Sequence, residues 1–301
     1  MGMTRALVTG IAGFTGRHLA HELAGAGYQV VGLTQIGGET GPETLACDLT
    51  NGEGLSAAML QLCPDVVVHL AGVTFVPPGG AEAFYRINLV GTRNLLSALA
   101  LLPRRPRAVL LASSATVYGN ASAGVIDESV APSPPNDYAV SKLAMEHMAL
   151  LWRGKLPITI VRPFNYTGVG QSIEFVLPKI VSHFQRRAPV LELGSLDVER
   201  DFSDVRTVVR CYRQLLDLQG ELLGSGVVLN VCSGRGHTLR DALSIASHLT
   251  GYMPEVRLNP TLVRDNEVKR LVGSRDALER WIGPVADVPL LETMRWMLSK
   301  A

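Results

Sequence analysis

Short apolar runs alternate with longer amphipathic stretches through the first half of the chain. The apolar runs are rich in Val, Leu and Ile, which is typical of strands buried on both faces of a parallel sheet. Between them, apolar residues recur at helical spacing. We expect strands at residues 6–9, 28–33, 66–70, 108–111 and 158–161, and helices at about 14–24, 81–102 and 138–152. This order predicts an α/β fold with helices on both faces of a doubly wound parallel sheet.

The alternation loosens after residue 163, where polar and glycine-rich stretches separate the expected elements. We expect helices near residues 175–187, 239–249 and 288–298, and a strand at 190–193. The apolar run 227–231 is expected to return to the main sheet. Each domain is therefore expected to combine separate stretches of the sequence. We predict a larger domain of residues 1–165, joined by about 200–240, and a smaller C-terminal lobe of residues 166–199 and 241–301.

The composition indicates a folded globular protein, with 47% hydrophobic and 18% charged residues. The 28 basic and 27 acidic residues nearly cancel, so the total charge favours neither nucleic acid nor an anionic membrane as a partner. No stretch approaches the ~20 apolar residues of a membrane span, and we expect a cytoplasmic protein. Four cysteines without metal-ligand spacing are expected to be buried, reduced thiols, and no metal site is expected: Cys47, Cys63, Cys211 and Cys232.

A glycine-rich turn directly follows the first expected strand. Gly10, Gly13 and Gly16 have GxxGxxG spacing and open the next helix. Such glycines allow a tight turn and a close approach of the backbone to a pyrophosphate, which the helix N-terminus attracts. In this context the turn predicts a Rossmann-type, dinucleotide-binding domain, although glycine also occurs in turns without a ligand. The residues expected around the cofactor from this turn and the strand ends beside it are Gly10, Ile11, Gly13, Phe14, Thr15, Gly16, Thr34, Asp48 and Leu49.

The end of the second expected strand bears on the choice of cofactor. Leu33 is followed by Thr34 and Gln35, without the acidic residue that often holds the adenine ribose of NAD. Without that carboxylate, nothing at this position repels the 2′-phosphate of NADPH, so NADPH is favoured and NADH is the alternative. Arg17 could reach that phosphate. Asp48 could accept a hydrogen bond from the adenine amino group or cap the following helix.

A tyrosine and a lysine begin the helix expected at 138–152. Tyr138 and Lys142 are four residues apart and share one helix face. A nearby ammonium stabilises phenolate and lowers the tyrosine pKa from its ordinary value near ~10, which suits proton transfer. Ser114 follows the strand at 108–111, at the edge of the sheet where ligands bind. Tyr-x-x-x-Lys alone could also be an exposed helical pair.

Taken together, the glycine turn, the Ser-Ser-Ala-Thr-Val-Tyr-Gly segment at 113–119 and Tyr-x-x-x-Lys resemble the extended short-chain dehydrogenase/reductase family, in its nucleotide-sugar-modifying branch. The resemblance runs through nearly the whole chain. It implies that Ser114, Tyr138 and Lys142 are catalytic and that Asn88 locks the backbone near them, although Asn88 could be a satisfied core amide. The resemblance also implies that Leu70, Ala71, Gly72, Tyr138, Lys142 and Arg162 lie around the cofactor. His69 is expected to be a satisfied core imidazole. A homodimer through the helices at 81–102 and 138–152 is common in such proteins.

The second half supplies the substrate contacts that this resemblance implies. Segments 162–171, 199–205 and 263–268 are similar to the family's nucleotide-sugar-binding segments, with Asp265 in place of a proline. We expect Arg200 and Arg264 to lie in loops, where they could clamp a diphosphate. Alternatively, they could pair with Asp201, Asp204 or Glu267. The larger domain would then hold the dinucleotide and the smaller lobe the substrate. The expected substrate-binding residues are Thr74, Phe75, Ser114, Asn165, Lys179, Arg200, Arg264 and Glu267.

The residues after Ser114 narrow the reaction type. Ala115 and Thr116 stand where the family's sugar dehydratases carry an acid, so elimination lacks its general acid. Segments 73–77, 162–171 and 230–234 most resemble GDP-4-keto-6-deoxymannose reductases. This similarity implies hydride transfer from NADPH to a GDP-linked 4-keto sugar, giving GDP-rhamnose, with the configuration at carbon 4 left open against 6-deoxytalose. The alternatives are a 4-epimerase with tightly bound NAD and a non-catalytic NADPH-sensing module.

Overall fold

The computed structural model describes residues 2–38, 43–77, 79–121, 124–218, 226–263 and 268–300. The chain forms two compact units. The first comprises Met1–Val117, Pro134–Arg162 and Val209–Leu229, and the second Tyr118–Ser133, Pro163–Val208 and Asn230–Ala301. Each unit therefore draws on separate stretches of sequence, and residues 118–133 lie with the second unit rather than the first.

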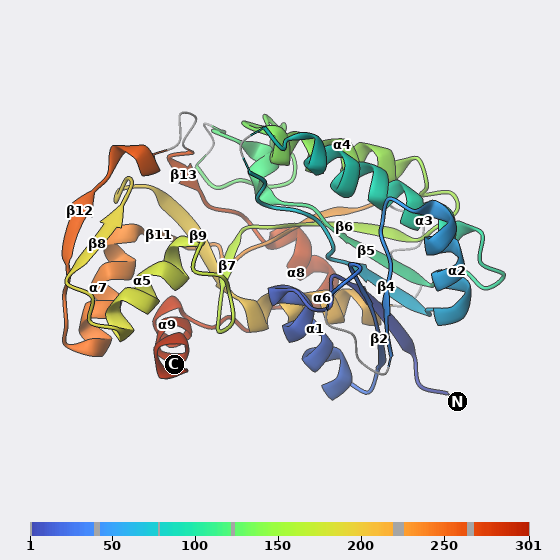
Figure 1. The fold of residues 1–301 in the computed structure, drawn as a ribbon, viewed down its shortest axis with the longest axis horizontal. Coiled ribbons are helices and arrows are strands. Elements are labelled where there is room, and N and C mark those ends of the chain that lie inside the picture. The colour runs from blue at the N-terminus through green and yellow to red at the C-terminus, as the bar shows by residue number, and fades with distance from the viewer. Residues whose placement is uncertain are drawn as a thin grey trace. The chain divides into compact units, whose positions relative to one another are not determined.

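A seven-stranded sheet is the centre of the first unit (Figure 1). Its strand order is β10-β6-β5-β4-β1-β2-β3, and the pairs from β6 to β3 are parallel. The order changes direction at β1, which lies between β4 and β2, and this is the switch point at which doubly wound sheets bind ligands. The strands are β1 (Arg5–Thr9), β2 (Gln29–Thr34), β3 (Thr44–Ala46), β4 (Val66–His69), β5 (Ala108–Ala112), β6 (Ile158–Pro163) and β10 (Val228–Val231).

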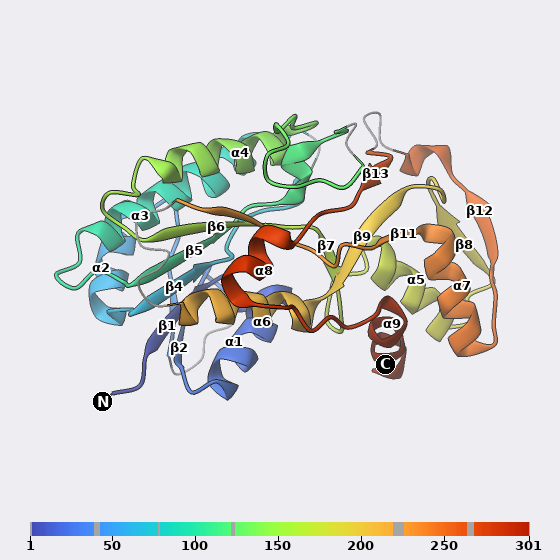
Figure 2. The same ribbon diagram turned by 180° about the vertical axis from the view of Figure 1, so that it is seen from behind.

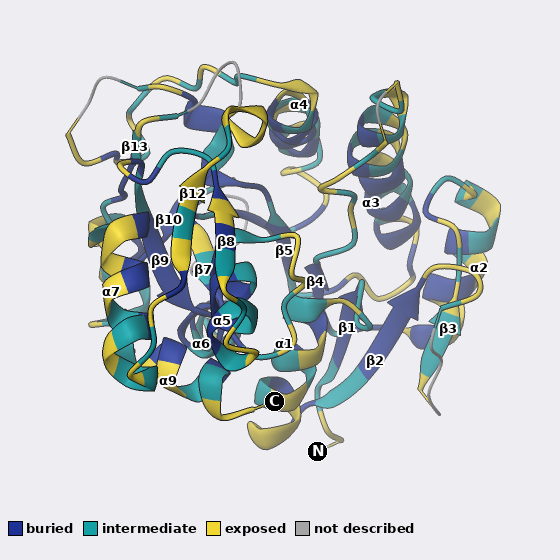
Figure 3. Cartoon of the chain, turned by 60° about the vertical axis from the view of Figure 1, so that its left-hand side comes forward, coloured by how far each residue is buried: buried dark blue, intermediate teal, exposed yellow. Residues whose placement is uncertain are grey.

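Helices cover both faces of this sheet, which explains why its strands are mostly apolar. All four residues of β4 are buried, as Figure 3 also shows. Helices α2 (Gly52–Leu62), α3 (Thr92–Ala100) and α4 (Asp137–Leu150) lie on one side (Figure 1). Helices α1 (Phe14–Gly25) and α6 (Val205–Asp217) lie on the other, where Arg213 of α6 pairs with Glu22 of α1 at 2.8 Å. The structure thus confirms the predicted α/β class and the return of residues 228–231 to the sheet.

The second unit has smaller sheets and its own helical core (Figure 2). Strand β9 pairs with β7, β11 and β13, while β8 and β12 form a separate parallel pair. Helices α5, α7 and α9 pack on one another around buried side chains such as Phe184, Leu243 and Met294. The elements are β7 (Asn165–Thr167), α5 (Val176–Gln185), β8 (Val190–Leu193), β9 (Glu199–Asp204), β11 (Gly236–Thr238), α7 (Leu239–Thr250), β12 (Glu255–Leu258), η3 (Pro260–Leu262), β13 (Arg270–Leu271), α8 (Asp276–Ile282) and α9 (Leu290–Ser299).

Three sequence predictions need correction. The helix expected at 81–102 begins as a π-helical segment, η1 (Phe84–Gly91), before α3 continues it. Segment 199–205 is largely strand β9 rather than a loop, so Arg200 stands on a strand. Cys211 and Cys232 are buried, but Cys47 is only half-buried and Cys63 is exposed at the end of α2; all four cysteines are free. Within the described ranges, no helix is both long and apolar enough to cross a membrane.

Candidate active site

The glycine turn between β1 and α1 has the shape that a pyrophosphate requires. Gly10 has a φ of +70°, and a Cβ there would lie 3.0 Å from the backbone of Ala71. A Cβ on Gly16 would lie 2.3 Å from the Gly10 carbonyl oxygen, so only glycine lets α1 start this close to the strand. No side chain caps α1, and its first turn contains no acidic residue. The positive N-terminal end of α1 therefore suits a dinucleotide phosphate.

The ends of β1, β2 and β4 meet at this turn. The Gly10 amide donates to the Leu33 carbonyl at 2.8 Å, and the Ala71 amide donates to Thr9 Oγ1 at 3.1 Å. Thr34 is buried at the end of β2. Most of the predicted cofactor residues thus belong to three adjacent strand ends and the turn between them. The members of this group are Gly10, Ile11, Gly13, Phe14, Thr15, Gly16, Thr34, Leu70, Ala71 and Gly72.

Asp48 does not cap a helix. Helix α2 is capped by Asn51, whose side chain accepts from the Gly54 amide, so the alternative of a capping aspartate was wrong. Asp48 instead accepts from the Thr50 amide and hydroxyl, both at 2.8 Å, and these hydrogen bonds lower the pKa of its carboxyl. The exposed carboxylate is thus ionised and able to accept from an adenine amino group. Leu49 beside it is buried.

Arg17 and Arg162 are both held by other groups of the protein. Arg17 donates to the Ala12 carbonyl at 2.7 Å from an exposed position on α1. Arg162 is buried and forms a bidentate ion pair with Glu146, with Nε–Oε1 and Nη2–Oε2 distances of 3.0 and 2.6 Å. Ser113 donates to the same carboxylate. Glu146 therefore ties α4 to β5 and β6, and a cofactor contact by Arg162 remains a prediction.

Tyr138 and Lys142 lie on the first two turns of α4, which Asn136 caps through the Ala139 amide. The Lys142 ammonium is buried and donates to the Ala112 carbonyl at the end of β5, at 2.9 Å. Burial lowers the pKa of Lys142 to about 8, against the opposing effect of the Glu146 carboxylate. The Tyr138 ring packs edge-on against Phe84, with ring centroids 5.9 Å apart. A buried cation thus lies one helical turn from the phenol.

Ser114 is the second residue after the end of β5 and is buried. Its Oγ accepts from the Thr116 hydroxyl at 2.8 Å and from the Thr116 amide at 3.2 Å. The short helix η2 (Ala115–Tyr118) holds this turn. The sequence placed Ser114 correctly at the end of the strand, but it did not reveal that Thr116 binds the serine hydroxyl.

Asn88 lies in the π-helical segment and bridges two parts of the site. Its Oδ1 accepts from the Val73 amide at 2.9 Å, while its Nδ2 donates to the Val73 carbonyl and to Ser141 Oγ, both at 3.1 Å. Ser141 in turn donates to the Tyr138 carbonyl at 2.7 Å. A Cβ on Gly72 would lie 2.8 Å from Asn88 Oδ1 and 3.5 Å from Lys142 Nζ. The predicted residues Asn88, Gly72 and Lys142 are therefore brought together.

His69 has the structural role predicted for it. The imidazole is buried, with Nδ1 2.7 Å from Thr9 Oγ1 and Nε2 2.9 Å from Thr92 Oγ1. Burial, together with the nearby Lys142 charge, lowers the pKa of His69 to about 3. The neutral ring therefore ties β4 to β1 and α3, and it is not available as an acid near neutral pH.

Two further residues of α4, Glu146 and Ser141, could have been noticed from their positions relative to Lys142. Glu146 follows Lys142 by four residues, as Lys142 follows Tyr138, so all three share one face of α4. Ser141 precedes Lys142 and faces Asn88. Neither position indicates that Glu146 binds Arg162 or that Ser141 binds Asn88, because these partners are distant in sequence.

The predicted substrate-binding residues are distributed over both units. Thr74 and Phe75 are exposed in the first unit. In the second, Asn165 is exposed at the start of β7, Lys179 donates to the Glu192 carbonyl at 2.8 Å, and Arg200 donates to the Glu199 carbonyl at 3.0 Å. Arg264 and Glu267 lie outside the described residues. Substrate binding by this group remains a prediction.

The carboxylates proposed as alternative partners of Arg200 have other contacts. Asp201 accepts from Ser233 and from the Gly234 amide at 2.7–2.8 Å. Asp204 forms a bidentate pair with Arg206 and accepts from Thr293. These contacts account for both buried aspartates without Arg200.

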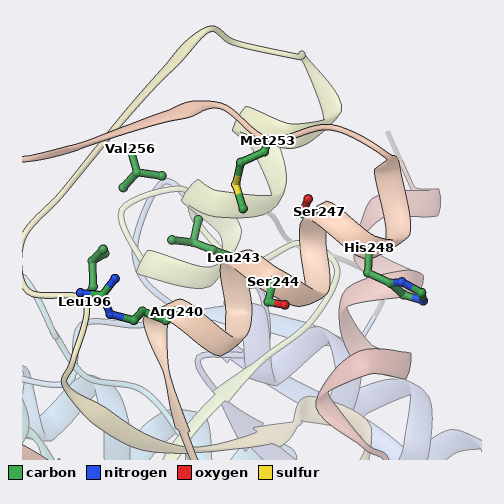
Figure 4. A pocket seen from close by; sticks show the side chains of 8 residues that line it. All are labelled: Leu196, Arg240, Leu243, Ser244, Ser247, His248, Met253 and Val256. Atoms are coloured by element: carbon green, nitrogen blue, oxygen red, sulfur yellow. The ribbon is translucent and has the colours of Figure 1, made fainter.

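A pocket of about 560 Å³ lies in the second unit along α7 (Figure 4). None of the predicted site residues that the structure describes lines it. Arg240 is already paired with Asp197 at 2.6 Å, and the rest of the wall combines apolar side chains with Ser244, Ser247 and His248. The lining residues are Leu196, Arg240, Leu243, Ser244, Ser247, His248, Met253 and Val256. No group of His, Cys, Asp and Glu in the described part of the chain is arranged to hold a metal ion.

Comparison with known proteins agrees with this geometry. The model of the NAD dependent epimerase/dehydratase family matches residues 6–232. The chain is 34% identical over 277 residues to a GDP-6-deoxy-D-talose 4-dehydrogenase of Aggregatibacter actinomycetemcomitans, covering 92% of this chain and 90% of that one. It is 35% identical over 310 residues to the GDP-6-deoxy-D-mannose reductase of Pseudomonas aeruginosa, covering 98% and 96%.

Solved structures give the same picture. A Burkholderia cenocepacia J2315 protein, provisionally named an epimerase, has a TM-score of 0.91 and 50% identity, covering 98% of this chain and 97% of its own. The structure of RMD from Pseudomonas aeruginosa complexed with NADPH has a TM-score of 0.85 and 34% identity, covering 99% and 97%.

Proposed function

Because the chain belongs to the NAD-dependent epimerase/dehydratase family, we propose that it reduces the 4-keto group of a GDP-linked 6-deoxyhexose, converting GDP-4-keto-6-deoxy-D-mannose to GDP-D-rhamnose with NADPH. The observation that carries this proposal is the buried Lys142 ammonium, held at the end of β5 one helical turn from Tyr138. Ser114 leaves the end of the same strand. The end of β5 and the first turns of α4 thus carry two hydroxyl donors, Ser114 and Tyr138, and the Lys142 ammonium.

The chain's own residues then bind the carbonyl and move one proton. Ser114 and Tyr138 donate hydrogen bonds to the oxygen on carbon 4 and polarise the carbonyl. When bound with its pyrophosphate at the glycine turn, NADPH would supply the hydride that carbon 4 accepts. The oxygen takes the Tyr138 proton, and the Lys142 charge stabilises the phenolate that remains. These groups favour the transition state because negative charge develops on the oxygen only there.

The choice of substrate is supported by the relatives. The names of both curated relatives concern GDP-linked 6-deoxyhexoses, and the chain covers at least 90% of each of them. The 6-deoxy sugars in these names differ at carbon 4, so the configuration formed here, rhamnose or 6-deoxytalose, is a separate question for the experiment. NADPH is favoured over NADH because Thr34 stands at the end of β2 without an acid. Contacts from Asn165, Lys179, Arg200, Arg264 and Glu267 to the nucleotide part of the substrate belong to this proposal.

A 4-epimerase is the second candidate, since family members and the name of one solved structure point to that activity. It is disfavoured because the acid that commonly holds NAD is absent after Leu33. We also propose a cytoplasmic location and a homodimer through η1, α3 and α4, as in the resembling proteins.

The test is oxidation of NADPH by the purified protein with GDP-4-keto-6-deoxy-D-mannose, followed by NMR of the product. We expect stoichiometric NADPH consumption and a single carbon-4 epimer. Interconversion of nucleotide sugars without net reductant, in protein that purifies with bound NAD, would instead establish the epimerase. NADPH binding without turnover of any 4-keto sugar nucleotide would indicate a sensing module.

A further inference from the structure

The serine hydroxyl of the site is itself hydrogen-bonded by a neighbour. Ser114 Oγ accepts from the Thr116 hydroxyl at 2.8 Å and from the Thr116 amide at 3.2 Å. A hydroxyl oxygen has two lone pairs and one hydrogen. With both lone pairs engaged, the only hydrogen bond left for Ser114 is the one that it donates.

The local backbone explains why Thr116 can do this. Ser114 precedes η2 (Ala115–Tyr118), and its carbonyl accepts from the Val117 amide at 3.2 Å. This turn places residue 116 over the serine side chain. Ala115 is buried and has no polar side chain. Thr116 is therefore the residue of this turn that adds a side-chain donor to Ser114.

We infer that Thr116 is a positioning residue that fixes the Ser114 hydroxyl as a hydrogen-bond donor to the oxygen on carbon 4. The inference rests on the proposed reductase function. A carbonyl oxygen, and the alkoxide forming from it, can only accept hydrogen bonds. Ser114 therefore stabilises this oxygen only when its hydroxyl is oriented as a donor. The threonine also polarises the serine O–H, since linked hydrogen bonds strengthen one another. Thr116 thus acts on the reaction through Ser114 and without touching the reacting atoms.

The alternative is that Thr116 only stabilises the turn. Both roles predict some effect on stability, so stability cannot separate them. A role through Ser114 predicts that the loss of the threonine hydroxyl lowers kcat more than it raises KM, because the contact to the oxygen strengthens as charge develops. It also predicts that this effect disappears when the serine hydroxyl is absent.

The experiment is a double-mutant cycle on the full chain with NADPH and GDP-4-keto-6-deoxy-D-mannose. We expect Thr116→Val to lower kcat about ten-fold, the effect of one hydrogen bond, with KM changed less than about two-fold. Thr116→Ser keeps the hydroxyl and should stay within about two-fold of the wild type. In a Ser114→Ala background, adding Thr116→Val should have no further effect on kcat. Melting temperature and NADPH affinity check that each variant is folded, and Thr116→Ala replaces Thr116→Val if the valine does not fit.

The outcomes separate the two proposals. A wild-type rate in Thr116→Val, or an equal fall of kcat in both backgrounds, overturns the role of Thr116 and leaves the reductase intact. A wild-type protein that reduces no 4-keto sugar nucleotide overturns the proposed function and the inference with it.

Discussion

The side chain of Asn88 holds the backbone of Val73 at both of its polar groups. Oδ1 accepts from the Val73 amide at 2.9 Å, and Nδ2 donates to the Val73 carbonyl at 3.1 Å. The same Nδ2 reaches Ser141, whose hydroxyl donates to the Tyr138 carbonyl. One buried amide therefore joins the segment after β4 to the helix that carries the proposed proton donor. The π-helical turn of η1 is where this amide is located, in line with the frequent occurrence of such turns at functional sites.

Replacing Asn88 by Ala should loosen this connection. The change removes the partner of the part-buried Val73 amide and carbonyl, which costs about 1–3 kcal/mol of unfolding free energy for each group left unpaired. We expect faster hydrogen exchange of the Val73 amide and a lower kcat, measured by NMR and by NADPH oxidation. Asn259→Ala, which removes an amide in the second unit, is the control and should leave kcat unchanged. Unaltered exchange at Val73 would contradict the role of Asn88.

Tyr138→Phe tests the proton donor. The substitution keeps the ring and its contact with Phe84 but removes the phenolic proton. We expect kcat to fall at least ~100-fold, with modest change in substrate binding, because general acid catalysis contributes about that much. NADPH oxidation and NADPH affinity are measured side by side. Near-wild-type turnover would rule out Tyr138 as the donor.

Lys142→Met should abolish turnover while raising stability at neutral pH. The folded-state pKa of about 8 lies below the ordinary value of 10.5, so the unfolded state binds the proton more tightly than the folded state. The wild-type protein therefore gains stability as pH rises from about 8 to 10.5, and below about 8 the buried charge carries its full cost. The excess unfolding free energy of Lys142→Met should be largest near pH 7 and shrink across this window. Urea unfolding at several pH values measures it, and a constant difference would contradict the assignment.

Glu146→Gln should destabilise the fold and shift the pH dependence of the reaction. It leaves the buried Arg162 without its carboxylate, which costs about 3 kcal/mol or more of unfolding free energy. Arg104→Ala, which breaks an exposed pair with Asp65, should cost less than about 1 kcal/mol and is the matched control. Because the Glu146 charge raises the Lys142 pKa, its loss should also move the alkaline fall of kcat to lower pH. Equal destabilisation by both variants would show that the buried Glu146–Arg162 pair contributes no more to stability than the exposed one.

Two glycines of α1 give a test of the cofactor turn. A Cβ on Gly16 would lie 2.3 Å from the Gly10 carbonyl, whereas nothing lies within 4 Å of a Cβ on Gly25. We expect Gly16→Ala to weaken NADPH binding at least about ten-fold, since 2.3 Å is well inside the 3.4–4 Å of an ordinary van der Waals contact and the turn must shift to accommodate the methyl. Gly25→Ala should bind NADPH as the wild type does and be slightly more stable. Titration of NADPH fluorescence measures both, and equal affinities would argue against pyrophosphate binding at this turn.

Features carried by neighbouring residues could be predicted from the sequence. The parallel sheet follows from uninterrupted apolar strands, and the glycine turn from its spacing, because each depends on local geometry. Tyr138 and Lys142 share a helix face for the same reason. The location of Ser114 near a strand end could also be predicted, since the carboxyl ends of parallel strands lie at one edge of a doubly wound sheet.

Tertiary structure alone decided which distant groups meet. Glu146 binds Arg162 and Ser113 across three elements, and His69 lies between two threonines of different elements. Residue types and spacing do not specify such partners, because a buried polar group can be satisfied by any donor or acceptor that folding brings near. The sequence by itself determined the sheet, the glycine turn and the residues able to do the chemistry. Only the packed structure decided that Lys142 is buried and shifted in pKa, and that Thr116 binds Ser114, because burial and contact exist only once the chain has folded.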